Sequence, residues 1–191
     1  LTNRVMQELL KIPYGARFID TTTASPQREC YNLNHTMTRT ESARYRFEQF
    51  KILHNTFNLV TGSETGQDYV VPECDYFEGM MSLGNYRIPD SGRNIYEVWE
   101  TAPEKTKKFQ VGENYRLPLF ELVYHGSLVS YWYWGDNSNK ILDIWKKRDL
   151  FNALYGVPPM YCFNESFWNE HEAGFVNSYK KAQPISFLSG Y

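Results

Sequence analysis

Apolar residues follow two alternating patterns in the first third of this chain. Residues 1–12 place apolar side chains at helical spacing and therefore predict a helix. A short apolar run over residues 16–20 predicts a buried strand that ends on a carboxylate. A second helix is predicted over residues 40–55, and a second strand over residues 57–61. This alternation is typical of a parallel sheet whose strands are joined by crossover helices.

The remaining chain continues the alternation with one interruption. Residues 82–116 are rich in glycine, proline and charge, and they indicate a loop or lid insertion, or a solvated surface insertion. Around this segment, strands are predicted over residues 74–81, 119–124 and 158–163, and helices over residues 141–155 and 164–181. An eight-stranded barrel needs about 250 residues. The 191 residues therefore predict one partial (β/α)₈ TIM-type barrel domain, roughly its second half, with a small free-standing α/β domain as the alternative.

Composition limits the kinds of ligand and the disulfide content that this chain is expected to have. The net charge is −2 and no basic stripe is visible, so a nucleic-acid partner is not expected. No apolar run is long enough for a membrane span, and no signal peptide is visible, so the compartment stays unknown. Aromatic residues make up 17% of the chain, which suits either a cleft that stacks against sugars or a large aromatic core. Three widely spaced cysteines favour buried free thiols over a disulfide framework.

Two carboxylates carry the candidate chemistry. Asp20 ends the first predicted strand, and Glu64 follows the second after one helix-containing crossover. The carboxyl ends of parallel strands share one edge of a sheet, so we expect the two side chains to meet there. Hydrolysis of a glycosidic bond needs two such groups, one to protonate the leaving oxygen and one to attack the sugar or to activate water. The spacing therefore predicts a catalytic carboxylate pair.

Five further residues are candidates for binding a sugar, each with a structural alternative. His125 and Asp136 could hydrogen-bond sugar hydroxyls, or serve as a core histidine and as an Asx turn. Trp132 and Trp134 alternate with tyrosines in one aromatic run, so some of these rings could line a cleft while others pack inward. Arg39 could clamp a carboxylate or hydroxyl of the ligand, or form a surface ion pair.

An ordered series of motifs resembles glycoside hydrolase family 129, which is related to family 101. The resemblance extends from about Gly15 to Gln183. The motifs are Phe18-Ile-Asp-Thr-Thr-Thr-Ala24, Glu29-Cys-Tyr-Asn-Leu-Asn-His-Thr-Met-Thr-Arg39, Val60-Thr-Gly-Ser-Glu-Thr-Gly66, Asp75-Tyr-Phe-Glu-Gly-Met-Met81, Pro118-Leu-Phe-Glu-Leu-Val-Tyr-His125, Tyr131-Trp-Tyr-Trp-Gly-Asp136 and Lys147-Arg-Asp-Leu-Phe-Asn-Ala-Leu-Tyr-Gly156.

The resemblance implies an activity and assigns two roles. Enzymes of this family are retaining, exo-acting α-N-acetylgalactosaminidases with a (β/α)₈ catalytic barrel flanked by β-rich domains. By resemblance, Asp20 would be the nucleophile and Glu64 the acid/base. The implied partners are a carbohydrate or the glycan of a glycoprotein, together with the remainder of the barrel and the flanking domains.

The family has also been associated with calcium, a hard cation that takes oxygen ligands. Asp68, Asp75 and Glu78 are the candidate metal ligands, although they lack the spacing of a calcium loop. One position departs from the expected motif, because Gly126 follows His125 where the resemblance leads us to expect an acidic residue. The residues that would contact metal and sugar therefore match the family pattern less well than the two carboxylates do.

Two other interpretations stay open at this point. The chain could be a non-catalytic carbohydrate-binding domain that keeps an aromatic cleft, or a structural fragment of a larger enzyme. If the chain belongs to an enzyme, both carboxylates should be needed for turnover. If it is a binding domain, sugar binding should survive the loss of both carboxylates. As an isolated fragment the chain is expected to be inactive, because half a barrel lacks the ligands that the other half supplies.

Overall fold

The computed structural model describes residues 1–82, 84–95 and 97–162. The chain divides into two compact units, Leu1–Glu78 and Gly79–Tyr191. The predicted helix over residues 164–181 lies outside the described residues.

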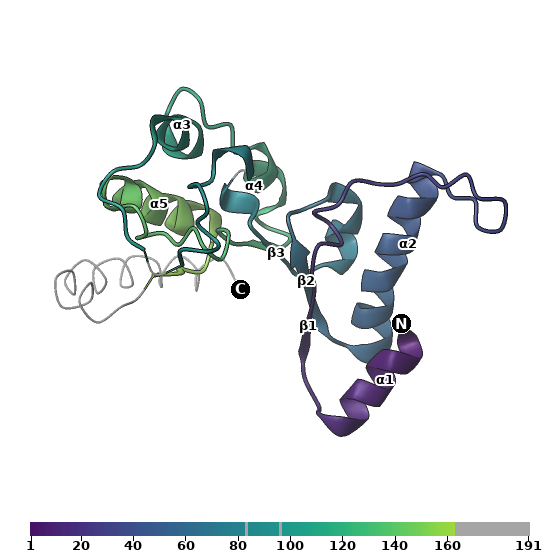
Figure 1. Ribbon diagram of the computed structural model, residues 1–191. Coiled ribbons are helices and arrows are strands. Elements are labelled where there is room, and N and C mark those ends of the chain that lie inside the picture. Colours follow the sequence, from purple (N-terminus) through teal and green to yellow (C-terminus); the bar gives the residue numbers. More distant parts are fainter. Residues whose placement is uncertain (83, 96, 163–191) are drawn as a thin grey trace. The chain divides into compact units, whose positions relative to one another are not determined.

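The first unit contains a parallel sheet with a crossover helix (Figure 1). Its elements are α1 (Thr2–Lys11), β1 (Ala16–Ile19), α2 (Arg39–Lys51), the π-helical turn η1 (Ile52–Thr56), β2 (Val60–Glu64), the 3-10 helix η2 (Asp68–Glu73) and β3 (Tyr76–Glu78). β1 pairs with β2 and β2 pairs with β3, and both pairings are parallel. The predicted α/β class is therefore confirmed, as are the first two helices.

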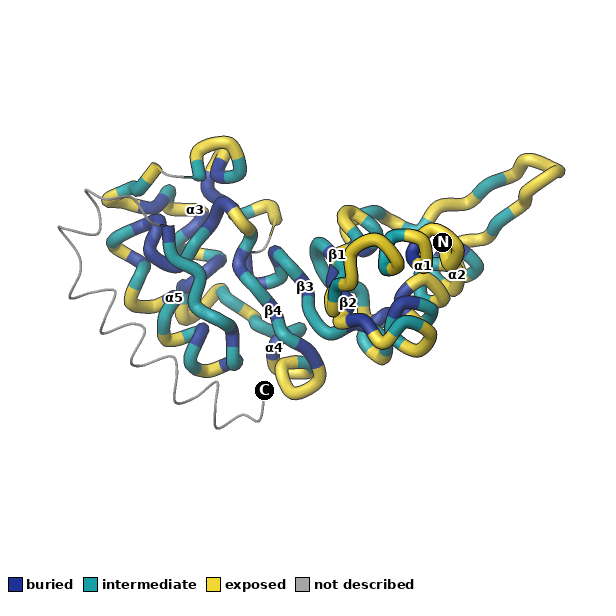
Figure 2. Tube along the Cα trace, turned by 90° about the horizontal axis from the view of Figure 1, so that it is seen from below, coloured by how far each residue is buried: buried dark blue, intermediate teal, exposed yellow. Residues whose placement is uncertain are grey.

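Local sequence explains where the crossover helix begins. The Thr38 side chain accepts a hydrogen bond from the Glu41 backbone N–H, and the Glu41 carboxylate accepts one from the Thr38 backbone N–H, which forms a capping box. The preceding loop, residues 20–38, contacts α2 in its first part, because Arg46 donates hydrogen bonds to the carbonyl oxygens of Ser25 and Pro26. Most of the remaining loop residues are exposed (Figure 2). The cap thus fixes the start of α2 after a long polar loop.

The two faces of the sheet differ in burial. On one face, Thr61, Ser63 and Phe77 are fully buried. On the other face, Phe18 and Val60 remain 41% and 49% exposed. The prediction of a buried first strand is therefore wrong for this unit, because only one face of β1 meets the core.

The second unit is mostly helical and irregular. Its elements are the 3-10 helices η3 (Met80–Ser82) and η4 (Gly84–Tyr86), α3 (Glu104–Thr106), the π-helical turn η5 (Lys107–Val111), α4 (Leu119–Tyr124), β4 (Val129–Ser130) and α5 (Leu142–Tyr155). The prediction of α5 is confirmed, and Gly156 ends it in the left-handed conformation at φ 65°.

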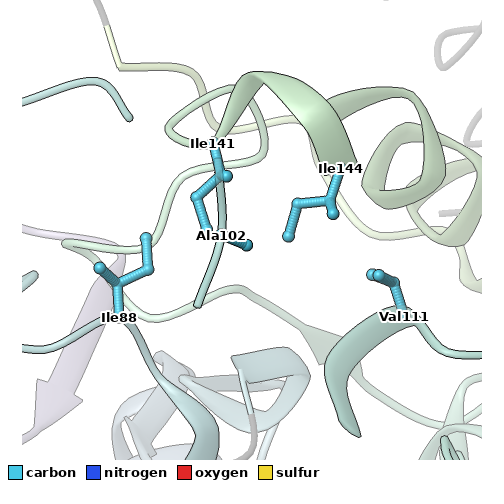
Figure 3. Close-up of a cluster of buried hydrophobic side chains, with 5 residues drawn as sticks. All are labelled: Ile88, Ala102, Val111, Ile141 and Ile144. Atoms are coloured by element: carbon cyan, nitrogen blue, oxygen red, sulfur yellow. The ribbon is translucent and has the colours of Figure 1, made fainter. Parts of the chain in front are cut away.

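One core cluster in this unit joins distant parts of the chain. Figure 3 shows Ile88, Ala102, Val111, Ile141 and Ile144 converging, and all five side chains are buried. The first three come from the segment predicted as a loop or lid insertion. That segment therefore supplies part of a core, although it contains little regular structure.

Several predicted elements are wrong in type or position. Residues 119–124 form α4 rather than a strand, since a short apolar run fits either element and Pro118 precedes it at the N-cap, where proline is tolerated. The second strand begins at Val60, later than predicted, and residues 158–162 form no strand. On α5, Leu150 and Leu154 are exposed although its apolar pattern predicts burial.

All three cysteines are free thiols, as expected, but they differ in exposure. Cys74 and Cys162 are buried, and burial raises the pKa of the Cys74 thiol to about 12. Cys30 is half-buried in the exposed loop, with its sulfur 3.2 Å from His35 Nδ1. Among the described residues, no helix is both long and apolar enough to cross a membrane.

Candidate active site

Three carboxylates stand at the same edge of the parallel sheet. Glu64 is the last residue of β2 and is paired in register with Glu78, the last residue of β3. Ile19, at the end of β1, is paired with Ser63, so Asp20 follows β1 directly beside Glu64. Parallel strands lie about 4.8 Å apart. The register therefore brings together the predicted pair and adds Glu78 on the next strand.

The side chains of this row share a face with an aromatic pair. Side chains two positions apart on a strand point to the same face, and the positions two before the carboxylates are Phe18, Gly62 and Tyr76. The rings of Phe18 and Tyr76 stack with centroids 6.1 Å apart and planes at 20°. A side chain at Gly62 would collide with the Tyr76 ring. Gly62 therefore lets the two rings meet across β2, next to the carboxylates.

The loop that follows Asp20 is tied to the end of β2. The hydroxyl of Thr23 donates to the Glu64 carbonyl oxygen at 2.6 Å, and its backbone N–H donates to the Ser63 hydroxyl oxygen at 3.3 Å. The Gln67 amide donates to the Thr23 carbonyl at 3.0 Å, and Thr23 is fully buried. These bonds fix the backbone on both sides of Glu64 relative to the loop that carries Asp20.

The Asp20 side chain itself is exposed to solvent. Its Oδ1 accepts a hydrogen bond from the Thr21 N–H at 3.0 Å. Thr21 has a φ of 56°, a left-handed conformation that is uncommon for a residue other than glycine and that clusters at functional sites. The turn therefore halts β1 immediately after the carboxylate and leaves Asp20 open to a ligand.

The three candidate metal ligands do not come together. Asp75 precedes β3 and lies at the opposite end of that strand from Glu78; its Oδ2 accepts a hydrogen bond from the Thr61 N–H at 2.7 Å. Asp68 begins η2, and its Oδ1 accepts from the Tyr69 N–H. In the part of the chain that the structure describes, no group of three potential ligands could hold a metal ion. These residues do not fit a calcium site, and we derive no catalytic step from one.

Two of the predicted sugar-binding residues belong to a core instead. Asp136 is fully buried, with Oδ1 2.7 Å from the Arg148 guanidinium and Oδ2 accepting from the Gln110 amide at 3.1 Å. Trp132 is also fully buried, and its indole N–H donates to Asn152 Oδ1 at 2.6 Å. The Arg148 guanidinium lies 4.7 Å from the centre of the Trp132 ring. In this structure the two residues stabilise the second unit rather than face a ligand.

The other three candidates lie at the surface. His125 follows α4 instead of a strand, and its Nδ1 lies 2.7 Å from the Glu121 carbonyl oxygen. Arg39 pairs with Glu29 at 3.4 Å and is 73% exposed, which matches the surface ion pair weighed above. Trp134 is 48% exposed and lies beside Tyr133. Of the five, Trp134 has the exposure that a sugar-stacking residue needs.

The comparisons with known proteins place the chain in a family. The family model described as glycosyl hydrolases related to GH101 family, GH129, matches residues 80–186, which is 107 of 191 residues and more than half of the chain. The chain belongs to this GH129 family. The match lies within the second unit and does not include the carboxylate edge.

Solved structures share the fold of this chain. The ligand-free alpha-N-acetylgalactosaminidase NagBb from Bifidobacterium bifidum matches 98% of this chain with a TM-score of 0.62 at 21% sequence identity. Its complex with GalNAc gives the same score and identity. The chain spans about a quarter of the length of these structures, 26% and 27%. No curated protein matches. The match and the parallel register confirm the predicted partial barrel.

Sequence reasoning missed two features of the candidate carboxylate site. The sequence assigns no role to Thr23 beyond its place in the Phe18–Ala24 motif, yet Thr23 makes the bonds that link the two strand ends. Glu78 was assigned to a metal rather than to the carboxylate row. The signal that could have found it is its place at the end of the next parallel strand.

Proposed function

We propose that this chain contributes the catalytic carboxylates of a retaining glycoside hydrolase that acts on α-linked N-acetylgalactosamine or a related sugar. Membership of the GH129 family supports the reaction class. The observation that carries the assignment of residues is the register of β1 and β2, which sets Asp20 beside Glu64. Because the chain covers about a quarter of the solved structures that it matches, the remainder of a barrel is part of the proposal.

The proposed mechanism uses the two carboxylates in turn. Asp20 attacks the anomeric carbon while Glu64 donates a proton to the leaving oxygen, which gives a glycosyl–Asp20 intermediate. Glu64 then takes a proton from water, which attacks the anomeric carbon and releases the sugar with retained configuration. A retaining pair needs carboxyl groups about 5–5.5 Å apart. The spacing of adjacent strands, about 4.8 Å, is close to this value.

The exposed face of the sheet supports a barrel around this site. Parallel sheets are generally covered on both faces. Here the face that carries the carboxylate row leaves Phe18 and Val60 in contact with solvent. Further strands and loops of a barrel would enclose this face and provide the rest of the sugar-binding site.

The test is turnover of an aryl α-N-acetylgalactosaminide by the full-length protein. Asp20→Asn should lower kcat by about 10⁴-fold or more. Catalytic residues that act together lose most of their rate enhancement when one of them is removed. Thermal unfolding should stay unchanged, since Asp20 is exposed. Activity within tenfold of the parent would contradict the assignment.

A matched pair of variants tests the choice of Glu64 over Glu78. Glu64→Gln should slow substrates with poor leaving groups far more than aryl substrates, because only the former depend on the proton donor. Added azide should accelerate the reaction of the Glu64→Gln variant with aryl substrates. Azide attacks the glycosyl intermediate in place of water and, unlike water, does not need a general base. Glu78→Gln is the control one strand away. If Glu78→Gln alone shows this pattern, the acid/base is Glu78.

A further inference from the structure

The second unit contains a cavity that no step above uses. Its volume is about 350 Å³, and it is lined by residues 87, 88 and 90–93 together with Tyr133 and Trp134. We call it the Trp134 cavity. All of its lining residues belong to the second unit, whereas Asp20 and Glu64 belong to the first. The residues that line this cavity therefore have no part in the proposed catalytic steps.

The Trp134 cavity is held in shape by buried contacts. The ammonium group of Lys140, which is fully buried, donates to the carbonyl oxygens of Ser91 and Asn94. A side chain at Gly135 would collide with the Ser91 backbone, and one at Gly92 would come within 2.8 Å of the Tyr133 hydroxyl. The two glycines thus allow the loop to pack against residues 133–135, and the lysine anchors it there.

The chemical groups in the cavity combine one flat apolar surface with charged hydrogen-bonding groups. Trp134 is half exposed, and the Arg87 guanidinium lies 3.8 Å from the centre of the Tyr133 ring. Arg87 Nε is buried and has no hydrogen-bond partner. Within residues 84–95 and 97–162, no ion pair involves Arg87, Asp90 or Arg93. An acceptor carboxylate and two guanidinium donors therefore remain available to a ligand.

We propose that the Trp134 cavity binds a pyranose sugar, which stacks its C–H face on Trp134 and hydrogen-bonds its hydroxyls to Asp90 and Arg87. Vicinal hydroxyls act as donors and acceptors at once, so they match a cavity whose lining offers both a carboxylate and guanidinium groups. A simple anion would be repelled by the Asp90 carboxylate. The volume lies at the lower end of the range for small-molecule sites, which suits a single sugar ring.

The choice of a sugar as ligand rests on the proposed function, because a glycosidase meets extended glycans. The cavity adds to that function a second point of contact, built from residues of the second unit. Binding at the Trp134 cavity requires no bond cleavage. It can therefore be measured in a protein that does not turn over.

The experiment is a titration of N-acetylgalactosamine into the full-length protein labelled with fluorotryptophan, followed by ¹⁹F NMR. The Trp134 signal is assigned by its absence from Trp134→Phe. It should shift on titration, and it should shift equally in the Asp20→Asn protein. Asp90→Asn should raise the midpoint of this shift by about tenfold, because it removes a charged acceptor. Glu29→Gln, an exposed carboxylate in the other unit, should leave the midpoint unchanged.

The outcomes separate this proposal from the catalytic one. A Trp134 signal that does not move, or an unchanged midpoint in Asp90→Asn, overturns the sugar site whatever the activity of Asp20→Asn. A shift produced by inorganic phosphate at lower concentrations than by the sugar also overturns it, in favour of an anion site. Full activity of Asp20→Asn overturns only the proposed nucleophile.

Discussion

The two units use the same residue types for opposite purposes. In the first unit, Asp20 follows a strand, is exposed, and accepts a hydrogen bond from its neighbour Thr21. In the second unit, Asp136 is fully buried and bound to Arg148 and Gln110. An aspartate next to an apolar run therefore lies at an exposed candidate site in one case and in a buried packing network in the other.

The buried aspartate lies inside the range of the family match, and the exposed aspartate lies outside it. The GH129 model matches residues 80–186, where Trp132 and Asp136 belong to a buried network with Asn152 and Arg148. The candidate catalytic pair lies outside that range, and its support comes from strand register. The part of the chain that matches the family model therefore contains a buried stabilising network, and the proposed catalytic carboxylates precede it in the sequence.

The strongest test of the comparison applies one substitution to both units. Asp136→Asn should lower the free energy of unfolding by about 3–5 kcal/mol, because it leaves the buried Arg148 cation without its counter-ion. Asp20→Asn should change it by less than about 0.5 kcal/mol, as expected for an exposed side chain. Urea unfolding of the full-length proteins measures both. Equal losses of stability would mean that the two aspartates do not differ in the way that their burial indicates.

A smaller effect is expected from the aromatic pair beside the carboxylates. Gly62→Ala places a methyl group against the Tyr76 ring and should cost about 1–3 kcal/mol by overpacking. It should also lower activity, since Tyr76 would move on the face that carries Glu64 and Glu78. Gly15→Ala is the control, because nothing lies within 4 Å of the added carbon. Similar unfolding midpoints for the two variants would argue against the close contact at Gly62.

The smallest effect concerns an ion pair at the amino end of the sheet. Hydrogen bonds from Arg17 and then Arg4 lower the pKa of the Glu8 carboxyl from its ordinary 4.5 to about 2. The folded state therefore binds this proton less readily than the unfolded state, so the stabilisation is complete above about pH 4.5 and is lost as the pH falls toward 2. Glu8→Gln should reduce the pH dependence of the unfolding free energy over this window. The reduction should be small, because solvent reaches both side chains of the pair and screens it. An unchanged acid slope would contradict the role of Arg17.

Much of the first unit could be predicted from sequence because its signals are local. The apolar spacing of residues 1–12, the polar loop before Thr38 and the carboxylates after two apolar runs indicate helices, strands and a shared edge. Less of the second unit could be predicted, because its core is assembled from residues that are far apart in the sequence. Ile88 and Ile141 meet there without a regular element around Ile88.

The site residues show the same limit. Asp20 and Glu64 could be placed because a parallel sheet aligns its strand ends. The burial of Trp132 and Asp136 could not be foreseen, because it depends on Arg148, Gln110 and Asn152, whose pattern in the sequence does not indicate a shared network. The alternation of aromatic residues along one short stretch cannot reveal partners that come from η5 and α5.

The unequal burial of the three thiols gives the chain a natural attachment point for probes. Cys74 and Cys162 are buried, and burial raises the pKa of both thiols, so neither presents a thiolate to a maleimide near neutral pH. Cys30 is half-buried on the loop that leaves β1 just after Asp20. A single fluorophore placed there would label the loop that follows the proposed nucleophile, without any cysteine having to be engineered into this part of the protein.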